Sequence, residues 1–242
     1  TIFLLPPTAP GADYRVRIFT PRQELPFAGH PSVGAAWAAL EAGLVPADRT
    51  TLVQECAAGL LPVRVEARAG ARLTHVRAPR AHEVAVDVPD ALMRGALHGM
   101  RTTARPAALW DNGPRWWLVE LADGDAVRAL QPDLAGIAAL TEATGAVGLA
   151  VHAPEARDGH HLVVRAFCPA DNIPEDPVTG SAQAAIAARL AAAGALPGTD
   201  GRYVGSQGRE LGRDGRVEVR VADGEVWIGG ATQPVIRGTV AW

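Results

Sequence analysis

Lysine is absent from this sequence of 242 residues, because all 23 basic residues are arginines. The absence excludes a lysine Schiff base and the phosphate-binding lysine of a P-loop within this chain. Cysteine is scarce as well, since Cys56 and Cys168 are too few for a disulfide framework. We therefore expect a protein of a reducing compartment, with the cytoplasm as its location.

Long apolar runs and a strong net charge are also missing. No run approaches the ~20 apolar residues of a membrane-spanning helix, and no signal peptide precedes the first strand pattern. The net charge of −3 and the pI of about 6.1 argue against a nucleic-acid partner, which would need clustered basic residues. With 48% hydrophobic and 20% charged residues, we expect a soluble globular chain of one large domain or two of ordinary size.

One stretch of the sequence occurs twice. Val16–Pro26 is matched 148 residues later by Val164–Pro174, with the valine, the arginine, the phenylalanine and both prolines at the same offsets. This spacing is too long for a solenoid, whose units repeat every ~20 to 50 residues. The repeat predicts two related lobes that contain both strands and helices.

Each copy continues through a glycine-containing turn into an alanine-rich segment. A helix is expected over about Pro31 to Ala42, since proline suits the first helical position and Gly43 is a typical stop. Its counterpart is expected from about Gly180 to Ala193. Both turns would therefore lie at helix N-termini.

Strands dominate the rest of the pattern. Apolar and β-branched runs bounded by turn residues predict them, with a hairpin turn at Asp223-Gly224 and two further helices at 89–98 and 132–144. The expected strands are 1–5, 15–19, 51–54, 61–67, 71–77, 115–121, 147–152, 161–167, 216–221, 225–228 and 235–241. Because strict alternation of strand and helix is absent, the predicted fold class is α+β with mostly antiparallel sheet.

The boundary between the lobes is placed in the linker near residues 101–106. This gives an N-terminal lobe of residues 1–104 and a C-terminal lobe of residues 105–235, with the last strand, about 236–242, returning to the first lobe. The chain opens at Thr1 inside a strand pattern and without an initiator methionine. From this opening we expect either a further segment upstream of Thr1 or a chain that is a processed fragment.

The two turns carry groups suited to an anionic ligand. The N–H groups of a first helical turn lack intrahelical partners and carry partial positive charge, so two such ends at one cleft would hold carboxylates well. Gly29 and Gly180 would let the backbone approach a ligand. The side chains of His30, Asp176 and Ser181 supply a base, an acceptor and a hydroxyl. Helix capping is the simpler explanation for one turn alone, but its duplication favours a shared site.

Several motifs resemble those of the phenazine-biosynthesis isomerase family, which is PhzF-like and has the diaminopimelate-epimerase fold. The motifs are Arg17–Pro21, Glu24–Pro31, Asn112–Arg115, Glu175–Ala182 and Gln207–Arg213. The resemblance covers nearly the whole chain. It implies two pseudo-symmetric lobes, each a mostly antiparallel sheet rolled around a central helix, with the active site between them and a homodimeric assembly. Characterised members isomerise a small cyclic diene that carries amino and carboxylate groups, without a cofactor.

The functional residues of the family map onto the two turns. The resemblance gives catalytic roles to His30 and Asp176, and substrate binding to Gly29, Gly180 and Ser181. It implies no metal and no other cofactor. The principal acid/base of the family, a glutamate, would stand immediately before Thr1, outside this sequence.

The reaction implied is a 1,3- or 1,5-proton shift on a small carboxylate. Its carboxylate would bind at the second helix end, Asp176 would hold an amino or hydroxyl group, and His30 would position or relay the proton. The glutamate would move the proton between carbons, and burial between the lobes would raise its pKa for that task. The alternative is a non-catalytic protein that binds a small anion, if the glutamate is truly lacking.

An amino-acid epimerase or racemase is a weaker alternative. In the related epimerases two cysteines act as opposed acid and base, and here Ala28 and Thr179 occupy their places. Neither side chain can form a thiolate, so racemisation by two thiols is disfavoured.

Other chemistry is less favoured. A serine hydrolase would need a G-x-S-x-G elbow, which the surroundings of Ser206 lack. The adjacent His160 and His161 have no companion ligand spacing, so an exposed loop edge is expected there rather than a metal site. Of Trp116 and Trp117, one ring is expected in the core and the other at the cleft or a dimer surface. A buried strand end is expected at Cys168.

Overall fold

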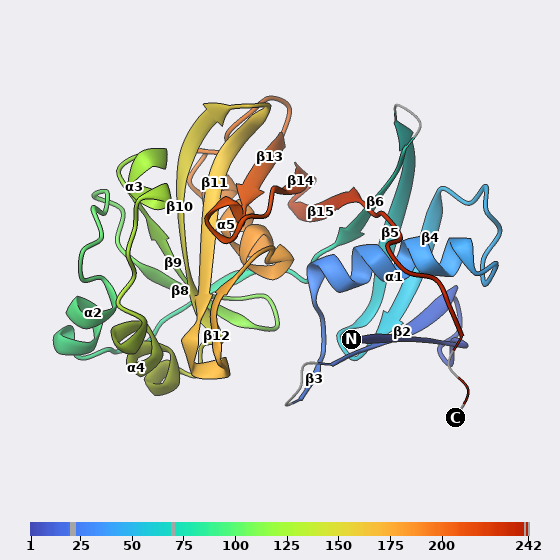
Figure 1. Ribbon diagram of the computed structural model, residues 1–242, viewed down its shortest axis with the longest axis horizontal. Helices are drawn as coiled ribbons and strands as arrows, with labels where there is room; N and C mark the ends of the chain where they lie inside the picture. The colour runs from blue at the N-terminus through green and yellow to red at the C-terminus, as the bar shows by residue number, and fades with distance from the viewer. Residues whose placement is uncertain (20–22, 69–70, 240, 242) are drawn as a thin grey trace.

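The computed structural model of the chain describes residues 1–19, 23–68, 71–239 and 241 (Figure 1). Its helices are α1 (Gly29–Glu41), α2 (Asp90–Ala96), α3 (Gly124–Arg128), α4 (Leu134–Thr144) and α5 (Gly180–Ala192), with short 3-10 turns η1 (Pro169–Asp171) and η2 (Arg209–Leu211). Its strands are β1 (Ile2–Leu5), β2 (Tyr14–Phe19), β3 (Glu24–Leu25), β4 (Thr51–Cys56), β5 (Gly59–Arg68), β6 (Ala71–Arg77), β7 (His82–Val84), β8 (Ala108–Asp111), β9 (Arg115–Glu120), β10 (Gly148–Arg157), β11 (His160–Cys168), β12 (Ile173–Asp176), β13 (Arg202–Gln207), β14 (Gly215–Ala222) and β15 (Glu225–Ala231).

The strands form one continuous sheet in the order β1-β2-β4-β5-β6-β15-β14-β13-β11-β10-β9-β8-β7, with β3 and β12 paired beside β2 and β11. Most neighbours are antiparallel, and β2/β4, β9/β10 and β11/β13 are the parallel pairs of the described residues. This confirms the predicted α+β class with a large, mostly antiparallel sheet.

The repeat in the sequence is also a repeat of connectivity. We call β1-β2-β3-α1-β4-β5-β6 the first unit and β10-β11-β12-α5-β13-β14-β15 the second unit. In both, the first strand is antiparallel to the second, a short strand pairs beside the second, and the strand after the helix runs parallel to the second. The last strands, β6 and β15, pair antiparallel with Val76 opposite Ile228, so the units join through equivalent strands.

Each unit packs its helix against the sheet. Helix α1 contacts β6, β15, β1 and β2, and α5 contacts β14, β15 and β9. Both helices bury alanines such as Ala36 and Ala185 without exposure, so their backbones can approach the strands closely. Helices α2, α3 and α4 cover the far side of the second unit and enclose a separate core around Ile137 and Leu149 (Figure 1).

The predicted last strand is wrong. Residues 232–239 and 241 form no strand, and the segment passes over α1 in Figure 1. Arg237 forms an ion pair with Glu41 of α1 at 2.8 Å and lies 5.8 Å from the ring of Trp37. The β-branched residues signal a strand, but a strand also needs a partner edge, and here Val235 and Ile236 are about nine-tenths exposed instead.

Other differences from prediction concern short elements. Strands β3, β7, β8, β12 and β13 and helix α3 were not expected, because two to six residues are too few to show a periodic pattern. Thr20, Pro21 and Arg22, which belong to the first copy of the repeat, lie outside the described residues. Among the helices that are described, none is long and apolar enough to cross a membrane.

Candidate functional site

The two central helices begin beside one another. A Cβ added to Gly29, the first residue of α1, would lie 2.7 Å from the Cα of Gly180, the first residue of α5. A Cβ on Gly180 would in turn lie 2.8 Å from the Cα of Gly29 and 2.9 Å from the Cδ1 of Ile228. Real Cβ atoms do not approach that closely, so only glycine permits this contact. The expectation that the repeated turns meet is confirmed.

Neither helix has a side-chain cap. Ala28 precedes α1 and has no side-chain oxygen, while Thr179 precedes α5 without capping it. The Thr179 hydroxyl instead donates to Oδ2 of Asp176 at 2.6 Å. Two helix ends with their dipoles directed to one place, and without caps, form a local positive field. The capping explanation for these turns therefore fails on the geometry.

Asp176 is a titratable group beside this junction. Burial raises the pKa of its carboxyl above the ordinary value, and the hydrogen bond from Thr179 and the nearby His30 offset part of that rise. The charged form is therefore harder to maintain here than on a surface. A carboxyl with a raised pKa can hold or accept a proton nearer to neutral pH.

Gln207 is a polar residue of this junction that was not among the residues expected from the sequence. Its amide Nε2 donates to the Asp176 carbonyl at 2.9 Å and to the Thr179 hydroxyl at 2.8 Å, and its Oε1 accepts from the Thr179 N–H at 3.1 Å. The side chain is fully buried. Gln207 thus orients the hydroxyl of Thr179 toward the Asp176 carboxylate. Its place in a resemblance motif was the signal that could have found it.

Ser181 is turned toward the protein rather than toward open space. It is buried, its Oγ accepts from the indole N–H of Trp116 at 3.1 Å, and its carbonyl accepts from the side-chain amide of Asn112 at 2.9 Å. Trp116 and Trp117 are both buried, so the expected core position of one ring is confirmed, and the indole of Trp116 lies beside Ser181 at the helix junction. Trp117 donates to the Thr144 hydroxyl at 2.9 Å on the other side of β9.

A cavity of about 570 Å³ adjoins the helix junction. It is lined by Gly29, His30, Val33, Gly34, Val178, Gly180, Asp214, Gly215, Arg216, Val217, Ile228, Gly229, Gly230, Ala231, Thr232 and Gln233. Of the expected site residues it includes Gly29, His30 and Gly180, and it does not include Asp176 or Ser181. His30 is exposed at the start of α1, so its ring is accessible to a ligand.

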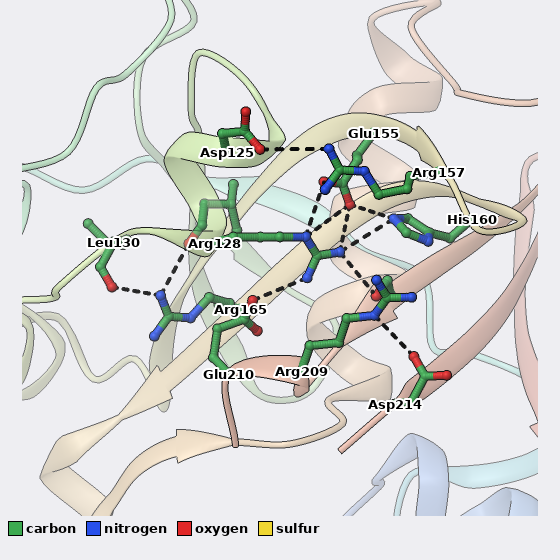
Figure 2. A network of polar contacts seen from close by, with 12 residues as sticks. Asp125, Arg128, Leu130, Glu155, Arg157, His160, Arg165, Arg209, Glu210 and Asp214 are labelled. Carbon is green, nitrogen blue, oxygen red and sulfur yellow. Dashed lines mark hydrogen bonds and ion pairs between the residues drawn. The ribbon is translucent and has the colours of Figure 1, made fainter. Parts of the chain in front are cut away.

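The loop from 208 to 215 supports the second turn. A Cβ on Gly208, whose φ is +90°, would lie 2.6 Å from the Pro177 carbonyl, and one on Gly215 would lie 2.5 Å from the Val178 side chain. Arg128 of α3 anchors this loop, because its Nη1 donates to Glu210 at 3.1 Å (Figure 2). The segment between Asp176 and Gly180 is therefore fixed by the loop.

Arg128 is the centre of a buried polar network (Figure 2). It binds Glu155 through Nε and Nη2 at 3.1 and 2.6 Å, and His160 lies 2.5 Å from the same carboxylate. These contacts hold the pKa of Glu155 at about 2, chiefly through the bond from Arg128. The predicted exposed loop edge is wrong: the His160 side chain is fully buried, and His161 accepts a backbone bond from Val204 at 3.2 Å.

No metal centre is visible in the part of the chain that the structure describes, where no group of three His, Cys, Asp or Glu side chains could hold an ion. Cys56 and Cys168 are free and buried, and burial raises the pKa of both thiols. Cys168 ends β11, which confirms the buried strand end. Neither thiol occupies the position before Gly29 or Gly180, so the arrangement offers a carboxyl and an imidazole in place of two thiols.

Comparison with known proteins gives a consistent result. The family model described as phenazine biosynthesis-like protein, PhzC-PhzF, matches residues 1–238. A trans-2,3-dihydro-3-hydroxyanthranilate isomerase of Pseudomonas aeruginosa is 35% identical over 190 residues, which cover 78% of this chain and 63% of that protein. The structure of a predicted epimerase from the same organism superposes with a TM-score of 0.76 at 30% identity, covering 99% of this chain and 83% of that one.

More distant structures share the fold alone. A probable proline racemase of Agrobacterium radiobacter has a TM-score of 0.65 at 18% identity, covering 97% of this chain and 75% of that one. The chain spans between 60% and 66% of the length of the curated relatives it matches.

Proposed function

The chain belongs to the phenazine biosynthesis-like protein family, and we propose that it is an isomerase that moves a proton between carbons of a small cyclic metabolite with amino and carboxylate groups. The proposed site lies at the junction of α1 and α5, between the two units. No cofactor is needed, because the proton is removed from one carbon and returned to another. We propose that the protein acts as a homodimer.

One observation carries the proposal: two uncapped helix N-termini meet at Gly29 and Gly180 beside a carboxyl with a raised pKa. The helix ends would bind the substrate carboxylate through backbone N–H groups, Ser181 included. Two helix dipoles would favour the negative charge that develops when a proton leaves carbon.

The proposed roles of the side chains combine the family resemblance with the contacts of each residue. Asp176 would hold the amino or hydroxyl group of the substrate and exchange a proton with it, and its raised pKa suits that task. His30, which lines the cavity, would position or relay the proton. Gln207 and Thr179 would orient Asp176. The family resemblance adds a glutamate directly before Thr1 as the group that removes the proton from carbon.

Racemisation by two thiols is not part of the proposal. The two positions that precede Gly29 and Gly180 hold Ala28 and Thr179, and Thr179 is already engaged with Asp176. The likeness to the proline racemase structure therefore extends to the fold and not to the acid/base pair.

The proposal is tested by proton exchange in D₂O followed by NMR, with trans-2,3-dihydro-3-hydroxyanthranilate as the probe. We expect the 242-residue chain to bind the probe but exchange its carbon-bound proton slowly. A version extended at its N-terminus by a segment that ends in glutamate should exchange it fast.

In the extended version, Asp176→Asn should slow exchange by roughly 10²-fold, the range of one acid/base group. Asp171→Asn, a change on the same repeat copy outside the site, is the control and should leave the rate unchanged. Equal rates in both variants would remove Asp176 from the mechanism. Binding without exchange in every version would favour the non-catalytic anion-binding protein.

A further inference from the structure

A second cavity, of about 240 Å³, lies on the face of the sheet that points away from α1 and α5. Side chains alternate between the two faces of a strand. On β15, Ile228 faces the glycines of the helix junction, while its neighbour Trp227 lines this second cavity. The cavity spans β5, β6, β13, β14 and β15, where the two units join. It shares no lining residue with the cavity at the helix junction, so binding here is independent of the proposed isomerase activity.

The cavity is rich in arginine. It is lined by Arg64, Glu66, Arg68, His75, His161, Thr199, Arg202, Tyr203, Val204, Glu218, Val219, Arg220 and Trp227. Both glutamates are already engaged: Glu218 binds Arg68 at 2.9 Å and His75 at 3.2 Å, and Glu66 lies 3.4 Å from Arg68. Within the described ranges, no carboxylate forms an ion pair with the other three arginines. The four arginines of this cavity therefore outnumber its two glutamates by two, and three of the guanidiniums have no ion-pair partner among the described residues.

The placement of these three arginines concentrates the charge. Arg202 and Arg220 stand directly opposite on β13 and β14, and Trp227 is the next residue across, opposite Arg220. The guanidinium of Arg64 lies over the Trp227 ring, 4.2 Å from its centre. Like charges opposite each other on neighbouring strands destabilise a sheet. An anion bound between Arg202 and Arg220 would compensate this repulsion.

The position of Arg64 over the Trp227 ring also orients its hydrogen-bond donors. A guanidinium presents its N–H groups in its own plane, where they can donate in pairs to a tetrahedral oxyanion, and the Trp227 ring beneath Arg64 favours its position. Trp227 is buried yet belongs to neither apolar core, so Arg64 is part of what covers it. The platform is thus preorganised for an acceptor with several oxygens.

We propose that this cavity binds a phosphate or diphosphate group through Arg64, Arg202 and Arg220. Phosphate oxygens match the paired donors of arginine, and a dianion matches the excess of positive charge better than a single carboxylate does. The volume is below the ~300 Å³ of a typical metabolite pocket, so the cavity holds the phosphate moiety and leaves the rest of any larger ligand outside.

The test is isothermal titration with inorganic phosphate and with pyrophosphate, at constant ionic strength set with chloride. The wild-type protein should bind one pyrophosphate per chain. The double variant Arg202→Gln/Arg220→Gln should bind it at least roughly tenfold more weakly, as expected when charge-assisted hydrogen bonds are lost. Arg94→Gln/Arg101→Gln makes the same change in net charge at two exposed arginines outside the cavity, and should change affinity by less than about twofold.

A conservative variant separates geometry from charge. Arg64→Lys keeps the charge but loses the flat fork, so affinity should fall several-fold. Thermal unfolding of each variant, followed by circular dichroism, verifies that it is folded.

Three results would overturn the proposal. The first is no saturable binding of pyrophosphate by the wild type, and the second is an equal loss of affinity in both double variants. The third is unchanged affinity in Arg202→Gln/Arg220→Gln, which would place the anion elsewhere, such as at the helix ends. If the wild type binds no pyrophosphate and sedimentation shows that Arg202→Gln/Arg220→Gln dissociates a dimer, the proposal is also wrong. That result would assign the surface to contact between copies.

Discussion

The same arginine–glutamate pair occurs in both units but in different surroundings. Arg17 of β2 donates twice to Glu24 of β3, at 2.9 and 2.7 Å, and Arg165 of β11 donates twice to Glu175 of β12, at 2.9 Å each. Each guanidinium also lies about 5 Å from the phenylalanine two residues on, at 4.9 Å for Phe19 and 5.1 Å for Phe167. The repeated sequence therefore forms the same ion pair and the same cation–π contact in both units.

The two arginine–glutamate pairs differ in how much they stabilise the protein, because they differ in burial. The first pair leaves 44% and 35% of its side chains exposed, and the second only 7% and 9%. In the second unit, α3 and the residues after it lie over the pair, and Arg165 also donates to the carbonyls of Val127 and Leu130 at 3.1 and 2.7 Å. An exposed pair contributes little, whereas breaking a buried one is costly. The local sequence determines that the ion pair forms, and burial by other elements of the fold determines how much it stabilises the protein.

Replacing Arg165 should have the largest effect. Arg165→Ala removes the charged partner of the buried Glu175 carboxylate and one donor each from the carbonyls of Val127 and Leu130, so the free energy of unfolding should fall by about 3–5 kcal/mol. Urea unfolding of the variant measures the loss. A fall below about 1 kcal/mol would mean that burial does not distinguish the two pairs.

Acid should weaken the second unit through Glu155. Its pKa is depressed from 4.5 to about 2, so the stabilisation is complete above pH 4.5 and is lost as the pH falls toward 2. The expected loss is on the order of 1–3 kcal/mol. Urea unfolding between about pH 5 and pH 2.5 should show a shallower pH dependence for Glu155→Gln than for the wild type. Glu24→Gln in the first unit is the matched control, and an equally shallow curve there would contradict the comparison.

Substitution of either glycine at the junction of α1 and α5 should lower stability by a similar amount. Gly29→Ala and Gly180→Ala each place a Cβ within 3 Å of the facing backbone, so each should destabilise the protein by about 1–3 kcal/mol and weaken binding of the probe substrate. Gly34→Ala in the same helix α1 meets no atom within 4 Å and should instead stabilise by up to ~1 kcal/mol. Thermal unfolding compares the three. A neutral result at Gly29 with a large loss at Gly180 would show that the units do not share the contact.

Replacing Arg17 should have the smallest effect. Arg17→Ala removes an exposed pair whose charges are screened by water, so the midpoint of urea unfolding should stay within experimental error of the wild type. A loss comparable with that of Arg165→Ala would show that exposure is a poor guide in this protein.

Features with a local signal could be predicted from the sequence. The alanine-rich segments with their flanking glycines gave α1 and α5 to within two residues, and the Asp223-Gly224 turn has the positive φ values, 54° and 74°, that such a hairpin needs. The approach of Gly29 to Gly180 followed from the repeat, because equivalent turns before equivalent helices meet where the units join.

Features that depend on distant partners could not be predicted. His160 follows the Asp158-Gly159 turn and looks exposed in sequence, but Arg128, 32 residues earlier, encloses it. Gln207 belongs to a motif of the family resemblance, but its contact with the Asp176 carbonyl, 31 residues away, has no local signal in the sequence. Burial of this kind is decided by which elements the fold brings together.

The most direct test of the proposed site is a crystal structure with 3-hydroxyanthranilate, a stable carboxylate related to the probe. We predict its carboxylate on the backbone N–H groups of Gly180 and Ser181, within reach of His30 and beside Asp176. The same ligand bound at full occupancy on another surface, with the junction of α1 and α5 empty, would contradict this prediction.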